Sequence, residues 1–360
     1  MSEFFLLKSI DAALHEATSK ISFLAINPAN IDEEKQKVLV DENYEPQFRY
    51  SNLPHNPDNV EEELDAVDDH DSVLGSLLTQ KRDIFIDKCE MMRCIGTPKF
   101  SIFAKKVCGF PKESTLARAA ELMSLESQNE KSVVSAAQAA HILRAELIHY
   151  GFPYIVKQKE MSSLAAVSVA DKCVFIRKDA CFSHQYIQRL IVHEIGTHVL
   201  RAENGRAQPF RIFLSGFPQY LATEEGLAVF NEERFGLLSA ETMRLYAARA
   251  IAVKMSQDRS FSKIYKYFLE RLGDDAAFKL ALRVKRGLAD TSKRGGFPKD
   301  FVYLEGYFTV KKFLEDKGEL QDLYWGKIGV EHAPLLTEVT GLSRPRFLPK
   351  NQGFVDLTHF

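Results

Sequence analysis

The sequence predicts a predominantly α-helical α+β protein, and three observations support this fold class. Apolar residues recur with helical spacing over residues 73–150 and again after Gly236. Between residues 153 and 178 the pattern changes to short strand-like runs. Directly after these runs comes an apolar helix that carries two histidines, at residues 190–200. The chain therefore combines many helices with one small β-sheet.

The first 72 residues are expected to form an N-terminal helix, an extended arm and an acidic linker. Residues 1–24 have the pattern of an amphipathic helix. Pro46, Pro54 and Pro57 then interrupt the chain, and residues 58–71 are strongly acidic. Residues 73–150 are predicted to be a helical support region, whose last helix begins after Ser135 and ends at Gly151.

Residues 151–350 are expected to form the catalytic region, and residues 351–360 a C-terminal tail. Three strands are predicted at residues 154–157, 165–169 and 173–177, and the last two form a hairpin that turns at Asp171 and Lys172. Ser183 is the predicted N-cap of the histidine-bearing helix, and Ser239 of a later helix. Another helix is expected from Val302 to Leu314.

Composition and charge exclude several classes of protein. The 360 residues carry a formal net charge of −2 and no block rich in Lys or Arg, so no nucleic-acid partner is expected. We find no signal peptide, and no uninterrupted apolar run approaches the roughly 20 residues that cross a bilayer. Five cysteines without C-x-x-C spacing favour reduced thiols. These features predict a cytoplasmic location without a membrane partner, and they leave the oligomeric state open.

The histidine-bearing helix contains a His-Glu-x-x-x-His motif, with His193, Glu194 and His198. In the common zinc peptidase motif the histidines are four residues apart, on one helical face. Here the interval is five residues, which rotates the second histidine by roughly 140° on an ideal helix of 3.6 residues per turn. A π-bulge would restore a common face, and Gly196 lies within the interval. The motif therefore predicts two metal ligands on a bulged helix, unless it is a chance match or a buried polar pair.

A carboxylate that completes the metal site is predicted about 26 residues further on. The next helix opens with Thr223, a plausible N-cap, followed by Glu224 and Glu225. Two histidines and one carboxylate leave a fourth coordination position for water, as catalytic zinc sites do. We therefore expect one Zn²⁺ ion in a zincin-like core, in which the small sheet lies next to the bulged helix. Glu232 is the first alternative for the carboxylate ligand.

Several motifs in the same order resemble one known family. These are His-Glu-Ile-Gly-Thr-His, the run Thr-Glu-Glu-Gly-Leu-Ala at residues 223–228, Val-Lys-Arg-Gly-Leu-Ala-Asp-Thr at residues 284–291, and Tyr-Leu-Glu-Gly at residues 303–306. Together they resemble the bacterial flavohaemoglobin expression-modulating "QEGLA motif" proteins. The same family includes the animal microtubule-associated tubulin tyrosine carboxypeptidase. The resemblance covers about residues 75–350.

The resemblance implies a zinc-dependent carboxypeptidase and assigns roles to particular residues. His193, His198 and Glu225 would bind zinc, and Glu194 would be the general base that activates the zinc-bound water. Glu224 occupies the place of Gln in the bacterial motif and would favour the helix dipole. The substrate would be the C-terminus of a peptide or protein, and release of a C-terminal tyrosine or another aromatic residue is the activity that the family implies.

A carboxypeptidase must also bind a free carboxylate, which a forked guanidinium does well. We expect Arg201, Arg286 and Lys299 to bind the substrate, because they lie in the family-like motifs. The segment from Arg201 to Gln219 is expected to be a loop beside the metal. Tyr303 is a candidate catalytic donor to the oxyanion. For all of these the alternatives are a surface salt bridge or a structural tyrosine.

Two other classes of function remain open from the sequence. One is a zinc endopeptidase or an amidase with a different substrate. The other is a non-catalytic regulatory protein in which zinc is structural. Structural zinc sites usually have a fourth protein ligand, and the sequence around residues 190–232 offers no obvious one.

Overall fold

The computed structural model describes residues 2–126, 133–161 and 164–350. Helices predominate, and the strands form one sheet of three strands and one of two. The predicted α-helical α+β fold class is therefore confirmed. The tail predicted for residues 351–360 lies outside the described residues, and the division of the chain at residues 72 and 150 stays a prediction.

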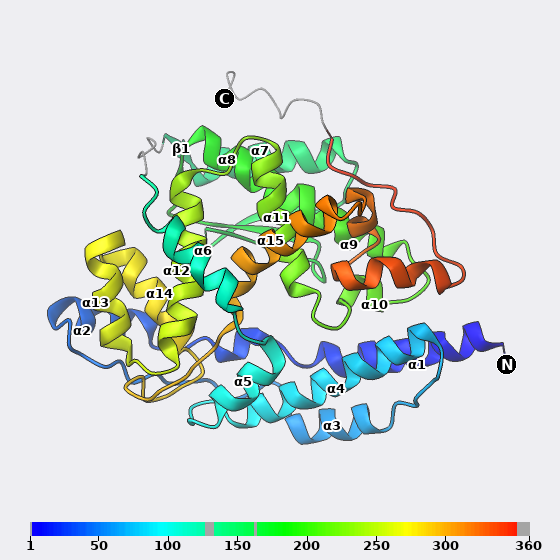
Figure 1. The fold of residues 1–360 in the computed structure, drawn as a ribbon, viewed down its shortest axis with the longest axis horizontal. Coiled ribbons are helices and arrows are strands. Elements are labelled where there is room, and N and C mark those ends of the chain that lie inside the picture. The colour runs from blue at the N-terminus through cyan, green and yellow to red at the C-terminus, as the bar shows by residue number, and fades with distance from the viewer. Residues whose placement is uncertain (1, 127–132, 162–163, 351–360) are drawn as a thin grey trace.

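Helices from the N-terminal part form a layer along the lower edge of the molecule in Figure 1. In this layer α4 contacts α1, α3 and α5. Leu14 of α1 and Leu64 of α3 are buried among these helices. The elements of this part are α1 (Glu3–Ser19), η1 (Phe23–Ile26), α2 (Ile31–Val40), α3 (Pro57–Asp65), α4 (Val73–Arg93), α5 (Phe100–Cys108) and α6 (Glu113–Leu122).

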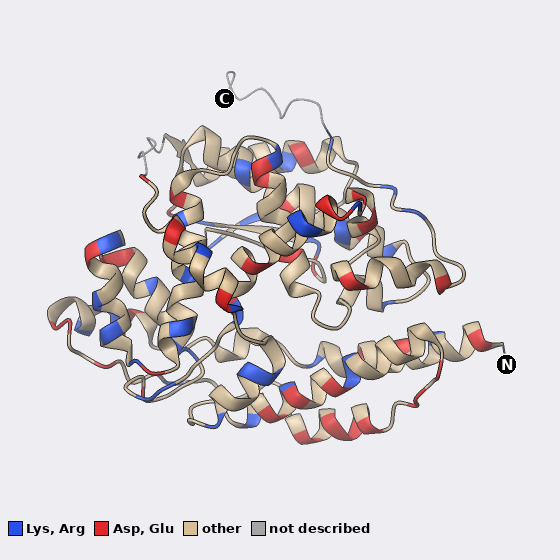
Figure 2. Cartoon of the chain, viewed as in Figure 1, with Lys and Arg blue, Asp and Glu red and all other residues tan. Residues whose placement is uncertain are grey.

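Residues 25–72 are more ordered than the extended arm and acidic linker that the sequence predicts. They contain both α2 and α3. The side chain of Asn56 caps α3 by accepting a hydrogen bond from the amide of Asp58, and Pro57 follows at the first helical position. Val60 and Leu64 lie on one face and are buried. The prediction was wrong because the many acidic residues concealed these signals; Figure 2 shows that they gather on α3.

The predicted hairpin is confirmed, since β3 and β4 pair antiparallel with Val167 opposite Val174. Strand β2 pairs parallel with the other edge of β4, so β3 is an edge strand of this sheet, and it contacts the histidine-bearing helix. Ser135 caps α7 as expected, and α7 packs on β2 and β4. The elements are β1 (Val134–Ser135), α7 (Ala136–His149), β2 (Ile155–Lys159), β3 (Ala165–Ser168), β4 (Cys173–Arg177) and β5 (Cys181–Phe182), which pairs with β1.

One continuous helical segment carries the histidines, and its middle is a nine-residue π-helix. The Oγ of Ser183 accepts a hydrogen bond from the amide of Tyr186 and caps this segment, as predicted. The segment extends past residue 200, so the loop expected from Arg201 to Gln219 is partly helical. The elements are α8 (His184–Leu190), the π-helix η2 (Ile191–Val199), α9 (Leu200–Arg206), α10 (Ile212–Ser215) and α11 (Leu221–Arg234).

In the remaining part, α12, α13 and α14 pack together at the left of Figure 1, around a core that includes Phe261 and Phe278. Ser239 caps α12 and the helix predicted from Val302 is present, so both predictions are confirmed. The elements are α12 (Ala240–Ser256), α13 (Phe261–Leu272), α14 (Asp274–Lys285), η3 (Lys299–Phe301), α15 (Val302–Glu315), η4 (Leu320–Tyr324) and η5 (Val330–Glu338).

Helices α11 and α15 cross with their backbones in direct contact. The contact lies at Gly226 and Gly306. A methyl group added at Gly306 would stand 1.8 Å from the carbonyl oxygen of Ala222, and one added at Gly226 would stand 2.0 Å from the carbonyl carbon of Gly306. Only glycine fits at either position, because the space that a side chain needs is filled by the opposite helix.

Within the described residues, no helix has both the length and the apolar character needed to cross a membrane. The five cysteines, all of them described, form no disulfide.

Candidate metal centre and adjoining cavity

The π-helix brings His193 and His198 onto one face. Its wider turn compensates for the five-residue interval, and the centroids of the two imidazole rings are 5.1 Å apart. The hydroxyl of Thr197 donates to the carbonyl oxygen of Val192, also five residues earlier, at 3.2 Å. The predicted bulge is therefore confirmed, and it extends over two turns of helix rather than one.

Glu225 of α11 faces both histidines. Its Oε2 lies 3.9 Å from Nε2 of His193 and 3.8 Å from Nε2 of His198. The three ligand-type atoms all lie within 4.8 Å of one another, and within the described part of the chain this is the one His/Cys/Asp/Glu group of that kind. The residues that the sequence assigns to the metal are thus brought together by the π-helix η2 and by α11, which are separated in the chain by α9 and α10.

Thr223 is not the N-cap of α11, contrary to the prediction. The helix begins two residues earlier, at Leu221. The Oγ1 of Thr223 instead accepts a hydrogen bond from the amide of Val330, at 3.0 Å. The threonine is therefore used to fix the start of η5 against α11.

Behind His193 lies a buried carboxylate, Glu232, which sequence reasoning proposed only as an alternative ligand. Its Oε1 is 2.7 Å from Nδ1 of His193, on the opposite side of the ring from Glu225. The same oxygen accepts hydrogen bonds from Arg189 at 3.0 Å and from the hydroxyl of Tyr246 at 3.3 Å. Burial opposes ionisation of Glu232, but the charge of Arg189 and the bond to His193 keep the pKa of this carboxyl below its usual range.

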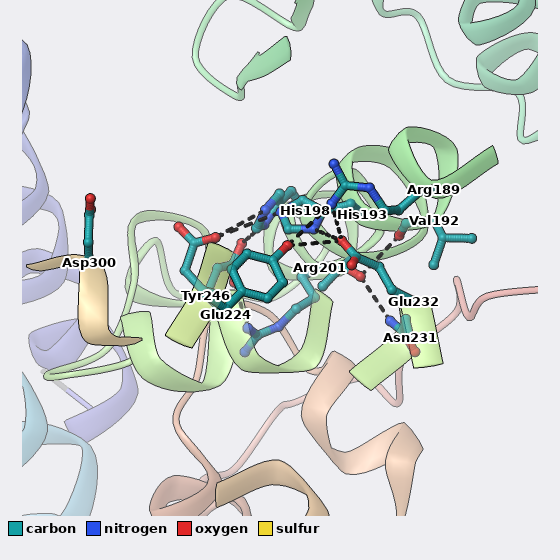
Figure 3. Close-up of polar contacts among 12 residues, drawn as sticks. Arg189, Val192, His193, His198, Arg201, Glu224, Asn231, Glu232, Tyr246 and Asp300 are labelled. Atoms are coloured by element: carbon teal, nitrogen blue, oxygen red, sulfur yellow. Dashed lines mark hydrogen bonds and ion pairs between the residues drawn. The ribbon is translucent and has the colours of Figure 1, made fainter. Parts of the chain in front are cut away.

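Behind His198 lies a second pair of this kind, formed by Glu224 and Arg201 (Figure 3). Oε1 of Glu224 is 2.8 Å from Nδ1 of His198, and its Oε2 accepts from Arg201 at 2.5 Å. Burial alone would raise the pKa of Glu224, but Arg201 and His198 bring it down to about 2. Burial alone would lower the pKa of His198, but the hydrogen bond and charge of Glu224 raise it to about 9. Glu224 is thus more than the helix-dipole residue that we expected.

The residues of this site fit a zinc ion. Each Nδ1 points to a carboxylate, so the proton of a neutral imidazole lies on Nδ1 and the lone pair of Nε2 faces Glu225. Two imidazole nitrogens and one carboxylate oxygen are a ligand set that catalytic zinc uses. The carboxylates behind the histidines orient the rings and raise their basicity.

A cavity of about 360 Å³ opens beside His193 and Glu194. Its volume is within the range of small-molecule and peptide-residue sites. Leu164 and Ala165 at the edge strand β3 line it, as do residues of α12 and α14. The cavity is rich in cations, and the charged residues that line it are Arg189, Glu194, Arg249, Asp275, Lys279, Arg283 and Arg286.

The three residues expected to bind the substrate lie in different surroundings. Arg201 is completely buried, and its guanidinium donates to Glu224 and to the carbonyl oxygens of Gly326 and Ile328. It does not line the cavity and lies behind the candidate metal centre, where it is held by Glu224. Lys299 lies beside the metal centre, with its Nζ 3.7 Å from Oε1 of Glu225.

Arg286 and Tyr303 both line the cavity. Nη1 of Arg286 donates to Oδ1 of Asn27 at 3.0 Å, and its Nε has no partner among the described residues. Burial lowers the pKa of Arg286 to about 10, so the guanidinium is charged at neutral pH. The ring of Tyr303 stacks on that of Tyr246, with centroids 5.3 Å apart. Burial and the charge of Glu225 raise the pKa of Tyr303, which keeps its hydroxyl proton available for donation.

Sequence reasoning did not select Arg189, Arg249 or Arg283. Arg189 is four residues before His193, so it lies on the same helical face, and this spacing was a usable signal. Arg249 and Arg283 lie on α12 and α14, and only tertiary packing brings them to the cavity. Arg283 forms an ion pair with the buried Asp300, whose pKa is thereby held below its usual range despite burial.

Replacing Arg201 with Ala is expected to destabilise the protein by about 3–5 kcal/mol, because Glu224 then keeps a buried charge without its partner. The carbonyl oxygens of Gly326 and Ile328 would lose their donor as well. Chemical unfolding monitored by circular dichroism measures the change. Arg206→Ala is the matched control on the same helix. Its side chain is 33% exposed and pairs with Glu203, so a loss below about 1 kcal/mol is expected. Equal stability of the two variants would contradict this role of Arg201.

Together, the fold and the site define a predominantly helical α+β protein with a buried His/His/Glu metal-type centre beside a basic cavity. A family model described as microtubule-associated tyrosine carboxypeptidase matches residues 37–356. The chain belongs to this family.

Curated relatives match shorter segments. Putative tyrosine carboxypeptidase MATCAP2 of Mus musculus is 26% identical over 209 residues, which are 55% of this chain and 40% of the relative. Microtubule-associated tyrosine carboxypeptidase 1 is 34% identical over 135 residues in Rattus norvegicus and 33% identical over 134 residues in Homo sapiens. Each of these two matches covers 35% of this chain and 27% of the relative. The match thus spans less than half of the length of each relative.

Proposed function

We propose that this chain is a zinc-dependent carboxypeptidase that removes the C-terminal residue of a peptide or protein. The observation that carries the proposal is the convergence of His193, His198 and Glu225 beside Glu194, at one end of a basic cavity. Three protein ligands leave a fourth position for water or substrate, which is typical of catalytic rather than structural zinc. Family membership supports the same class of reaction.

The residues of the chain have separate roles in this reaction. When bound, zinc supplies a Lewis acid and lowers the pKa of a water molecule. Glu194 takes a proton from the attacking water and returns it to the leaving amine, a transfer that general bases accelerate by about 10²- to 10⁴-fold. The hydroxyl of Tyr303 donates a hydrogen bond to the carbonyl oxygen as its negative charge develops. Glu224 and Glu232 hold the two imidazoles in orientation.

Arg249 and Arg286 are the best placed cations for the substrate carboxylate. Arg189 and Arg283 are already paired with Glu232 and Asp300. Arg286 is more loosely paired, with its Nη2 4.0 Å from Oδ1 of Asp300. Nε of Arg249 and of Arg286 is buried without a hydrogen-bond partner in the described residues, as is Nε of Arg189. The guanidinium of Arg249 lies over the ring of Tyr303, at 4.4 Å from the centroid, so it stands next to the proposed oxyanion donor.

The peptide upstream of the cleaved bond fits along β3. This strand is at the edge of its sheet, and Leu164 and Ala165 at its start line the cavity. An edge strand offers main-chain donors and acceptors to any extended peptide. The proposed path therefore runs along β3, passes the metal centre and ends at the arginines.

Replacing Arg249 with Met is expected to lower kcat/KM for peptides with a free C-terminus by about 10- to 100-fold, the usual value of a hydrogen bond to a charged group. Amidated peptides, which lack the carboxylate, should be poor substrates of both proteins and insensitive to the substitution. Steady-state kinetics on matched free and amidated peptides measure both effects. Equal losses on the two peptide types would argue against carboxylate binding by Arg249.

Mass spectrometry of a peptide pool tests the proposed function directly. Peptides with free and with amidated C-termini are incubated with the zinc-loaded protein. Loss of single residues from free ends alone would support a carboxypeptidase. Internal cuts would favour an endopeptidase, and release of ammonia from amidated ends would favour an amidase. No cleavage by a protein that binds one equivalent of zinc would contradict the proposal and favour a regulatory protein with structural zinc.

The names of the relatives favour a C-terminal tyrosine as the residue released, and a substrate associated with microtubules. The cavity supports an aromatic residue, since Tyr186, Leu245 and Tyr246 contribute to its walls. The predicted cytoplasmic location is consistent with such a substrate.

A further inference from the structure

A segment outside the family match forms part of the cavity. Asn27, Pro28 and Ile31 line the same space as His193 and Glu194. The family model begins to match at residue 37. The metal centre thus lies within the residues matched by the family, whereas this part of the cavity wall does not.

Hydrogen bonds hold this segment in place. The amide of Ala29 donates to the carbonyl oxygen of Arg49 at 2.8 Å, and the side chain of Asn30 bonds to the backbone of Gln47 and of Arg49, both at 2.9 Å. Phe48, which lies between Gln47 and Arg49, is in turn fixed to the loop after α14, because its amide donates to the carbonyl oxygen of Ala289 at 2.7 Å. The segment is therefore a fixed wall rather than a loose arm.

Two polar contacts join the segment and the helix α2 that follows it to α14 and to Arg286 directly after α14. Asn27 accepts a hydrogen bond from Arg286, as described above. Nζ of Lys35, one turn beyond Ile31 on α2, lies 2.8 Å from Oδ1 of Asp275. The position of the wall is thus coupled to one of the two arginines proposed to bind the carboxylate.

The wall is apolar where it faces α14. Pro28 and the half-buried Ile31 line the cavity together with Ala276 and Leu280 of α14. The apolar part of this surface selects side chains by size and apolar area, and the polar side chain of the wall, Asn27, is bonded to Arg286. Asn27 of this wall contacts Arg286, one of the two arginines proposed to bind the substrate carboxylate.

We propose that residues 27–31 form the wall of the subsite that receives the side chain of the released residue, and that Ile31 sets the largest side chain accepted. This inference rests on the proposed carboxypeptidase function. It assigns specificity to a segment outside the matched residues, so family members that share the metal centre can differ in the residue that they release.

The test compares C-terminal Trp, Tyr, Leu and Ala on one upstream peptide, with the full chain. Ile31→Ala is expected to raise the kcat/KM ratio of Trp over Leu by about tenfold, and Ile31→Phe to lower it by a similar factor, because a single methylene in an apolar pocket is already worth about tenfold or more. Each ratio is measured on one preparation, so a loss of folded protein cancels. Val40→Ala is the control, since Val40 is on the same helix and 90% exposed; its ratio should be unchanged.

A binding measurement separates the two proposals. Dissociation constants of the same peptides are measured for Glu194→Gln, alone and combined with each Ile31 substitution. If the unmodified protein releases no residue from any peptide, the proposed function fails, and the binding ratio alone then decides on the wall. If residues are released but both Ile31 variants keep the ratio of Val40→Ala, the inference about the wall is overturned while the proposed function stands.

Discussion

Replacing Glu194 with Gln is expected to lower turnover by about 10³-fold or more while the protein keeps its zinc. The amide is close in size to the carboxylate but cannot take the proton, and general-base catalysis contributes about 10²- to 10⁴-fold. The ligands His193, His198 and Glu225 are untouched. The measurement combines metal content by mass spectrometry with the rate of residue release.

Glu203→Gln is the matched control for this experiment. Glu203 lies on the same continuous helical segment but bonds to Tyr154 and Arg206, away from the cavity. Its rate should be close to that of the unmodified protein. Loss of zinc from Glu194→Gln would contradict the assignment of Glu194 as base, because it would place this residue among the ligands.

Replacing Glu225 with Ala is expected to remove zinc, whereas replacing Glu232 with Ala should weaken binding by about 10- to 100-fold. The reason is the position of each carboxylate relative to His193. Glu225 faces Nε2, where the metal would lie, and Glu232 contacts Nδ1 on the other side of the ring. Titration with a zinc chelator measures both affinities.

The opposite result would assign the third zinc ligand to a different residue. If Glu225→Ala kept its zinc and Glu232→Ala lost it, Glu232 would be the ligand and the ring of His193 would have to turn over. If both variants lost zinc, Glu225 would remain the proposed ligand. The Arg189–Glu232 pair would then contribute more to zinc affinity than a carboxylate that only orients a histidine usually does.

The sequence could predict that His193 and His198 share one face because the signals for this are local. The five-residue interval predicts a wider helix, and the π-helix is the observed form of that wider turn. Serines at residues 135, 183 and 239 cap helices where expected, because a capping side chain bonds to the amide a few residues later. These features need no knowledge of the rest of the chain.

The cavity could not be predicted in the same way. Arg249 and Arg283 belong to helices whose order in space depends on packing, and Ile31 reaches the cavity from a segment more than 150 residues before His193. Arg201 was chosen because it lies in a family-like motif, but a motif does not tell which face of a helix is buried. Its side chain is buried and pairs with Glu224 instead, a contact that only the packing of α11 against this helix creates.

The glycine crossing of α11 and α15 has a consequence for how the site can change over time. Glu225 precedes Gly226 in the chain, and Tyr303 precedes Gly306 by one helical turn. The separation of Glu225, the proposed metal ligand, from Tyr303, the proposed oxyanion donor, is therefore set by two main chains in contact, rather than by the sizes of side chains between them. Residues elsewhere in the hydrophobic core can be exchanged without altering that separation. A change in the cavity wall would therefore leave the distance between the two proposed catalytic elements in place as long as both positions stay glycine.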